Sequence, residues 1–334
     1  MKTTLRYLRP LASIASFALF VYVLKRSGPE AVLDQIRLVG WGFAFLILLS
    51  GIRYLLRAVA WSYCVPGGRR PTPLELLGPR LMGEALNDVT PAGPLLGETA
   101  KLAVVSRLIP APAAASSVVI ENLVYILAAV VFMLSGLVLA LLKLTAPHGL
   151  RWMGGELVIC LLAPIAVAGW LVSRRFLLLG RTLDYLKRVR LGWAFLEPRQ
   201  HNLRAIEQAV YDFFLTRRGT FLAVLGIEIA TNFTGIGEAY LVLKVTAAHT
   251  SLFAAYLAES ANRAVQLAFS FVPFGLGIQE GAAAATLQAL GYAASEGVSL
   301  AIIRKIRTLF WAALGLLLAA KYSMARPAGE ESAI

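Results

Sequence analysis

Long apolar stretches alternate along this chain with short segments that carry most of its charges. A helix needs about 20 apolar residues to cross a bilayer. The stretches that approach or exceed this length are 5–24, 39–63, 114–142, 156–173, 219–245 and 298–321. Two further apolar regions, 74–109 and 251–292, are interrupted by glycine and proline. We predict an all-α polytopic membrane protein with six full spans and two re-entrant hairpins, about eight membrane segments in all. The pattern also fits two full passes in each interrupted region.

The two interrupted regions share a polar pattern. The first reads, in order, Glu84-x-x-Asn87, Pro91-x-Gly93 and Gly97-Glu98. The second reads Glu259-x-x-Asn262, Pro273-x-Gly275-x-Gly277 and Glu280-Gly281. The number of residues that separates Glu84 from Glu259 is the same as the number that separates Asn87 from Asn262. Carboxylates and broken helices are costly in lipid, so paired, broken segments in two halves indicate a transporter's substrate site.

The repeat and the charge pattern together suggest an inverted-repeat helical bundle in a single integral membrane domain, 1–334. The first repeat is 39–142 with hairpin 74–109, and the second is 219–321 with hairpin 251–292. The segment 174–218 between them holds ten Lys and Arg against four acidic residues. Since such an excess marks cytoplasmic loops, we expect this segment and both chain termini in the cytoplasm.

Within that basic segment, apolar residues recur at helical spacing between charges, namely Leu203, Ile206, Val210 and Phe213. This spacing predicts an interfacial helix on the inner leaflet.

The composition supports a membrane protein and excludes several other classes. The chain is 58% hydrophobic with 15% charged residues, whereas soluble domains carry about a quarter. Its net charge of +13 lies between the apolar segments, where it orients helices and attracts anionic headgroups rather than nucleic acid. The two cysteines and three histidines lack metal-ligand spacing, so we expect no metal and no cofactor.

Polar side chains inside the apolar segments are the candidate substrate-binding residues. A lone charge at the bilayer centre costs about 2.5–3.5 kcal/mol, so each must pair, line an aqueous cavity or be protonated. The candidates are Arg53, Arg57, Glu84, Asn87, Glu98, Glu121, Glu228, Asn232, Glu259, Asn262, Arg263, Glu280 and Arg304. Corresponding positions of the two halves carry opposite charges, which suggests that acidic helices face basic ones.

Simpler interpretations stand beside these. Arg53 and Arg57 can snorkel to the headgroups, and Glu98 and Glu280 can cap half-helix N-termini. We expect the prolines and glycines of the two interrupted regions to form the hairpins by breaking the helices and exposing backbone amides. These residues are Pro91, Gly93, Gly97, Pro273, Gly275, Gly277 and Gly281.

Two motifs resemble a known family. They are Gly83-Glu84-x-x-Asn87-x3-Pro91 through Gly97-Glu98-x-x-Lys101, and Pro273-Phe-Gly-Leu-Gly277-Ile-Gln-Glu280-Gly281 with Arg304 downstream. Both are similar to the membrane (flippase) region of the lysylphosphatidylglycerol synthase/flippase family, and the likeness covers most of the chain. The sequence around Glu280 also resembles the hopanoid-biosynthesis-associated branch. The chain departs from many relatives at Asn122, where they carry a basic residue.

The resemblance implies movement of a lipid, or of its headgroup, between leaflets of a bacterial cytoplasmic (inner) membrane. The partners implied are anionic, zwitterionic or aminoacylated phospholipids or hopanoids, with a lipid-synthesising enzyme and a second copy of the chain as further possibilities. Full-length synthases add a cytosolic aminoacyl-transfer domain. The chain stops at Ile334, so we expect no such enzymatic activity. Two alternatives stay open: an intramembrane transferase acting on a polyprenyl- or phospholipid, and a scaffold for a lipid-modifying enzyme.

Overall fold

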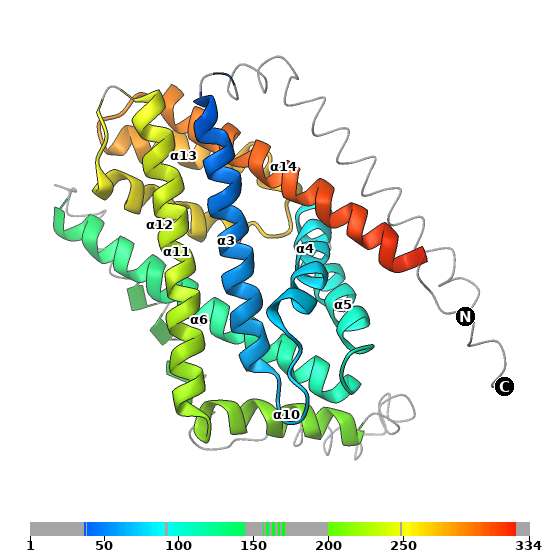
Figure 1. The fold of residues 1–334 in the computed structure, drawn as a ribbon. Coiled ribbons are helices and arrows are strands. Elements are labelled where there is room, and N and C mark those ends of the chain that lie inside the picture. Colours follow the sequence, from blue (N-terminus) through cyan, green and yellow to red (C-terminus); the bar gives the residue numbers. More distant parts are fainter. Residues whose placement is uncertain are drawn as a thin grey trace. The chain divides into compact units, whose positions relative to one another are not determined.

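The computed structural model describes residues 37, 39–90, 93–143, scattered positions in 156–170, 200–247 and 249–324. Within them the regular secondary structure is helical, as Figure 1 shows. The predicted span 5–24, Pro91 and most of the span 156–173 lie outside the described residues. An all-α membrane protein, as predicted, is therefore confirmed for the part of the chain described.

In the described part of the chain, three helices have the length and the apolar composition of membrane spans. They are α3 (Trp41–Cys64), α6 (Ala111–Lys143) and α11 (Arg218–Thr246), with 24, 33 and 29 residues. They coincide with three of the predicted spans because each apolar run is bounded by charged or helix-breaking residues. The last described helix, α14 (Ala294–Met324), has 31 residues, and it carries Arg304, Lys305 and Arg307 inside the apolar stretch predicted as a span and Lys321 at its end.

The first interrupted region forms two short helices, α4 (Pro73–Val89) and α5 (Gly93–Val105). They have 17 and 13 residues, and each is shorter than the roughly 20 residues that a full crossing needs. The two helices cross at Gly83 and Gly97. A Cβ atom on Gly97 would lie 3.3 Å from the Gly83 carbonyl carbon and closer still to its oxygen, so this crossing requires glycine.

The second interrupted region also forms two short helices, α12 (Leu252–Ala268) and α13 (Ile278–Ala289). Between them lies a single 3₁₀ turn, η2 (Pro273–Gly275). Around this turn the backbone is left-handed at Gly275 and Gly277, with φ of 55° and 81°. Glycine adopts this conformation at no steric cost. Of the predicted helix-breaking glycines, Gly275 and Gly277 therefore lie at this break, whereas Gly97 lies inside α5 and Gly281 inside α13.

Helix α10 (Gln200–Leu215) lies in the predicted amphipathic segment and packs against α6. Phe213 is buried and makes edge-to-face contacts with Phe214 and with Phe221 of α11. Arg204, Gln208 and Asp212 of α10 are exposed, whereas Glu207 is buried. The apolar face of the helix is thus turned to protein and its polar face outward.

The chain divides into two compact units. Unit 1 contains the described parts of Met1–Tyr54, Leu77–Val104 and Gly235–Ile334, and unit 2 those of Leu55–Leu76 and Val105–Thr234. In unit 1 a buried cluster joins Ala85 and Val89 of α4, Phe274 of η2, and Leu309 and Ala312 of α14. The end of α4, the turn of the second hairpin and the middle of α14 therefore meet. Both predicted repeats contribute to both units, and their symmetry stays a prediction.

Candidate functional site

Helix α14 carries three cations within one turn, and each pairs with a carboxylate from a different helix of unit 1. Arg304 pairs with Glu259 of α12, Lys305 with Glu280 of α13, and Arg307 with Glu238 of α11. Successive helical positions point about 100° apart, so these side chains leave α14 in three directions. The middle of α14 is thereby bonded to three neighbouring helices.

Glu259 is the centre of this network. Its Oε2 atom lies 2.5 Å from Arg304 Nη2, and its Oε1 atom lies 3.1 Å from Arg263 Nε, one turn further along α12. Arg304 Nη2 also donates a hydrogen bond to the Gly235 carbonyl at 3.2 Å. Glu259 and Arg263 are 2% and 1% exposed. The three predicted residues Glu259, Arg263 and Arg304 thus form one buried ion triad.

Gly235 of α11 makes room for this triad. A Cβ atom there would collide with the carboxylate of Glu259. The close approach of α11 and α12 at this point therefore depends on the absence of a side chain.

Glu280 combines the two roles that the sequence leaves open for it. Its Oε2 atom accepts a hydrogen bond from the backbone N–H of Gly277 at 2.9 Å, which caps the N-terminus of α13. Its Oε1 atom pairs with Lys305 of α14. One carboxylate thus satisfies a free helix amide and fixes the second hairpin to α14.

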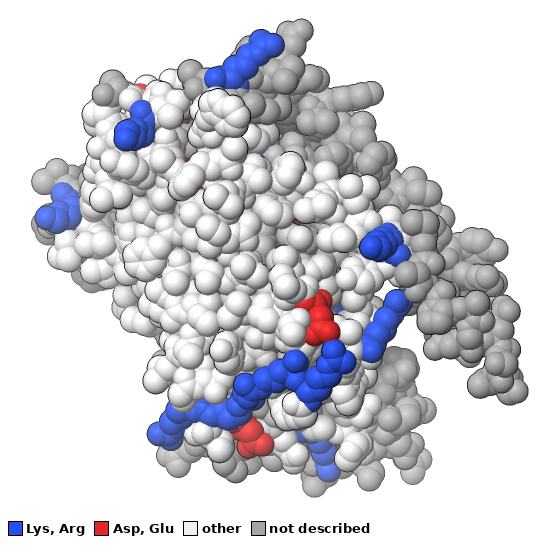
Figure 2. All heavy atoms as spheres, in the orientation of Figure 1, with Lys and Arg blue, Asp and Glu red and all other residues white. Residues whose placement is uncertain are grey.

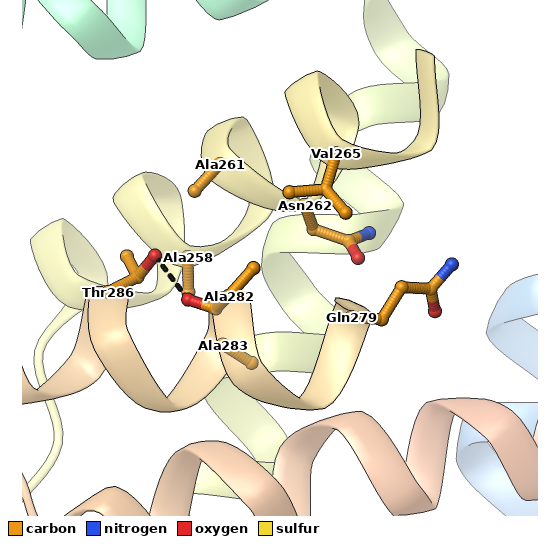
Figure 3. A pocket seen from close by; sticks show the side chains of 8 residues that line it. All are labelled: Ala258, Ala261, Asn262, Val265, Gln279, Ala282, Ala283 and Thr286. Carbon is orange, nitrogen blue, oxygen red and sulfur yellow. Dashed lines mark hydrogen bonds between the residues drawn. The ribbon is translucent and has the colours of Figure 1, made fainter. Parts of the chain in front are cut away.

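The second hairpin also contains a small groove between α12 and α13, shown in Figure 3. Small side chains, among them Ala258, Ala261 and Ala282, form its walls. The carboxamides of Asn262 and Gln279 lie at one end of it, on facing helices. The predicted residue Asn262 is therefore apart from the ion triad, although it is next to Arg263 in the chain.

Charged groups in the first hairpin pair within their own helices. Arg80 Nη2 lies 3.2 Å from Glu84 in α4, and Lys101 Nζ lies 2.8 Å from Glu98 in α5. Arg80 and Lys101 are buried, whereas both glutamates are partly exposed. The predicted residues Glu84 and Glu98 are therefore bound to cations one turn away.

The polar residues at the end of α4 include one, Asp88, that interacts with Arg53 of α3. Asp88 follows Glu84 by one turn and interacts electrostatically with Arg53 and Arg307. Between them in the chain, the Oδ1 atom of Asn87 is buried and makes no hydrogen bond within the described part of the chain. A carboxylate pair, two guanidinium groups and a buried amide oxygen thus gather where the hairpins meet α14.

A second buried ion cluster lies in unit 2. Arg57 of α3 is placed between Glu121 of α6, at 3.2 Å, and Glu228 of α11, at 3.6 Å. Its guanidinium group also lies 4.0 Å from the centroid of the Tyr125 ring. The predicted residue Asn232 donates a hydrogen bond to the Glu228 carbonyl at 3.1 Å. One cation of α3 thus faces carboxylates of two other helices, and these pairs do not join corresponding positions of the two halves.

Several residues of these clusters were not among the predicted site residues. They are Arg80, Asp88, Lys101, Tyr125, Glu238, Lys305 and Arg307. All except Tyr125 are residues that carry a charge at neutral pH inside apolar or interrupted segments, which is itself the signal that could have identified them. Within the described residues, no three His, Cys, Asp or Glu side chains gather in a way that could hold a metal ion.

Comparison with known protein families gives a match over most of the chain. The family model described as Lysylphosphatidylglycerol synthase TM region matches residues 11–315. Neither the curated proteins nor the solved structures gave a match.

Proposed function

The chain belongs to the Lysylphosphatidylglycerol synthase TM region family, and from this premise we propose that it moves a lipid headgroup between the two leaflets of a membrane. Family membership and the apolar helices make it a multi-pass membrane protein with a function connected to membrane lipids. The proposal places it in the bacterial cytoplasmic membrane with both termini in the cytoplasm, and it assigns no catalytic step to the chain.

The observation that carries the proposal is the set of three ion pairs between α14 and its neighbours. A headgroup that crosses a bilayer must pass through apolar surroundings, where every charge needs a partner. Arg304, Lys305 and Arg307 offer cations that a phosphate can bind. Their partner carboxylates offer anions to an amine. Unit 1 therefore contains both halves of the recognition that a zwitterionic or aminoacylated lipid requires.

Exchange of partners is the step that this arrangement favours. Removing one partner of a buried ion pair costs about 3–5 kcal/mol, because the remaining charge is left uncompensated. A headgroup that supplies a phosphate to the freed cation and an amine to the freed carboxylate avoids this cost. The Lys305–Glu280 pair is the first candidate for exchange, because the Glu280 side chain is 22% exposed while the Glu259 side chain is 2% exposed.

Two capping glutamates allow a matched test of this idea. Glu280 accepts a hydrogen bond from the Gly277 N–H at 2.9 Å, and Glu296 accepts one from the Ala293 N–H at 3.0 Å. Both cap a helix from its third position, but Glu280 also pairs with Lys305. Glu280→Gln therefore removes an ion pair together with a charged cap, whereas Glu296→Gln changes a charged cap alone.

The experiment uses the purified chain in liposomes and follows the exchange of fluorescently labelled lipids between leaflets. The lipids are phosphatidylethanolamine, phosphatidylglycerol, lysylphosphatidylglycerol and a hopanoid. We expect the wild type and Glu296→Gln to exchange at least one of these lipids, and Glu280→Gln to be slower by about tenfold or more, which corresponds to about 1.4 kcal/mol. Equal rates for the two variants would contradict the exchange mechanism. An inactive wild type would contradict transport by the chain alone and favour a scaffold or a transferase.

A further inference from the structure

Unit 2 has a group of arginines at the place where α3 ends and α11 begins. We call Arg69, Arg70, Arg217 and Arg218 the arginine rim. All are exposed except Arg217, which is partly buried. Figure 2 shows Lys and Arg side chains in a run along the lower part of the view, where α10 lies in Figure 1. Because α3 and α11 are both long apolar helices, the rim lies where their apolar segments end.

Two residues of the rim are held in place by backbone carbonyls. Arg217 donates hydrogen bonds to the Val65 and Tyr63 carbonyls, at 3.3 and 3.2 Å, and so closes the C-terminal end of α3. Arg218 donates from Nε to the Leu215 carbonyl at 3.1 Å. The positions of these two guanidinium groups are therefore set by the junction of α3, α10 and α11.

The loop that follows α3 is fixed in a similar way. Arg69 pairs with Glu75 at 2.8 Å, and Glu75 also accepts a hydrogen bond from the Thr72 backbone N–H at 2.7 Å. The bond from Thr72, together with the charge of Arg69, holds the pKa of Glu75 below its ordinary value. Glu75 is thus an ionised partner of Arg69, and this contact orders the loop that carries Arg70.

Arg70 and Arg217 lie close enough to repel each other. The pKa of Arg217 is lowered, first by burial and then by the positive charge of Arg70. Two cations held near each other raise the free energy of the protein unless an anion compensates them. Among the described residues of this region, the acidic side chains that reach the surface are Glu75, which is partly exposed and bound to Arg69, and Asp212 of α10, which is exposed. The rim therefore has a net positive charge.

We propose that the arginine rim binds the phosphodiester headgroups of anionic lipids in the leaflet next to the ends of α3 and α11. Guanidinium groups bind phosphate through paired hydrogen bonds, and their position at the end of apolar helices places them at headgroup depth. An acidic protein or a nucleic acid would need a surface that stands clear of the lipid. This binding site lies in unit 2 and does not depend on the translocation proposed for unit 1.

Two double substitutions, one in the arginine rim and one outside it, give a matched test. Arg70→Gln with Arg218→Gln removes two positive charges from the rim. Lys143→Gln with Lys244→Gln removes two exposed lysines from the last turns of α6 and α11, and Lys244 lies at the end of α11 away from Arg218. The full-length protein in dodecylmaltoside is mixed with equal amounts of phosphatidylglycerol and phosphatidylcholine. Native mass spectrometry then gives the ratio of the two lipids bound.

We expect the wild type and the lysine variant to prefer phosphatidylglycerol to the same extent, within about twofold. The preference should fall by about fivefold for each arginine removed, as expected for a basic residue near an anionic surface. Arg70→Lys with Arg218→Lys should restore most of it. Size-exclusion chromatography verifies folding, and Arg70→Gln alone, at an exposed side chain, serves if the double variant does not fold.

Three results would overturn the proposal. They are a wild type without preference for phosphatidylglycerol, an equal loss of preference in the lysine variant, and displacement of the bound lipid by 10 mM inorganic phosphate. The last result would identify the rim as a site for free anions. None of these outcomes bears on leaflet exchange, so the two proposals fail separately.

Discussion

Glu259→Gln is the sharpest test of the ion pairs in unit 1, because it keeps the shape of the side chain and removes its charge. The carboxylate lies 2.5 Å from Arg304 and 3.1 Å from Arg263. No side chain of the three is more than 10% exposed. In the variant both guanidinium groups stay buried and face a neutral amide, so the folded state loses two charge compensations at once.

The size of the effect follows from the burial of the pair. Breaking a buried ion pair by removing one partner costs about 3–5 kcal/mol. Folded proteins are stable by only about 5–15 kcal/mol, so this is a large part of the total. In large domains about 1 kcal/mol lowers the melting temperature by roughly 2 °C. We therefore expect Glu259→Gln to melt about 6–10 °C below the wild type.

The assay is thermal unfolding of the purified full-length protein in one detergent, followed by circular dichroism. Glu75→Gln is the matched control, because it removes a carboxylate from an arginine pair whose side chains are 67% and 33% exposed. Exposed pairs add little to stability, and the control should melt within about 2 °C of the wild type. If Glu259→Gln melts no lower than this control, the buried triad does not stabilise the fold and the reasoning is wrong.

Two glycine pairs test the packing and the turn by the same unfolding assay. Gly235→Ala places a methyl group against the carboxylate of Glu259 and should lower the free energy of unfolding by about 1–3 kcal/mol. In Gly226→Ala, in the same helix, the methyl group meets no atom within 4 Å, and the free energy of unfolding should rise by up to about 1 kcal/mol. Equal effects of the two substitutions would contradict the contact. Gly277→Ala forces a side chain onto a backbone with φ of 81° and should lower the free energy of unfolding by about 1–2 kcal/mol. Gly281→Ala, inside α13, should leave the free energy of unfolding unchanged or raise it. A Gly277→Ala variant as stable as the wild type would refute the left-handed turn.

The apolar pattern predicts the long helices well because lipid leaves the sequence few choices. A helix that crosses the bilayer must be predominantly apolar, so its ends are readable from the charged or helix-breaking residues that bound the apolar run. The predicted span 39–63 is the helix Trp41–Cys64, and the predicted span 219–245 is the helix Arg218–Thr246. Proline and glycine likewise mark the break between α12 and α13, where the left-handed residues lie.

The pairing of charges is less accessible to sequence reasoning. The sequence shows that Lys305 and Arg307 lie near one end of an apolar run, and snorkelling to the headgroups explains that equally well. Their carboxylate partners lie on α13 and α11, far away in the chain. Tertiary packing decides which helix lies against each side of α14. For this reason Arg304, which belongs to the family motif, is the single residue of this turn among the predicted site residues.

The three pairs of α14 also restrict how unit 1 can move during a transport cycle. The Glu259–Arg304 and Glu238–Arg307 pairs are nearly buried, with no side chain more than 11% exposed. Breaking both at about 3–5 kcal/mol each would require about 6–10 kcal/mol, which is comparable to the stability of a whole protein. A cycle in which α14 slides past α11 and α12 is therefore unfavourable. Either these helices move together, or a ligand replaces one partner at a time, beginning with the more exposed pair at Glu280.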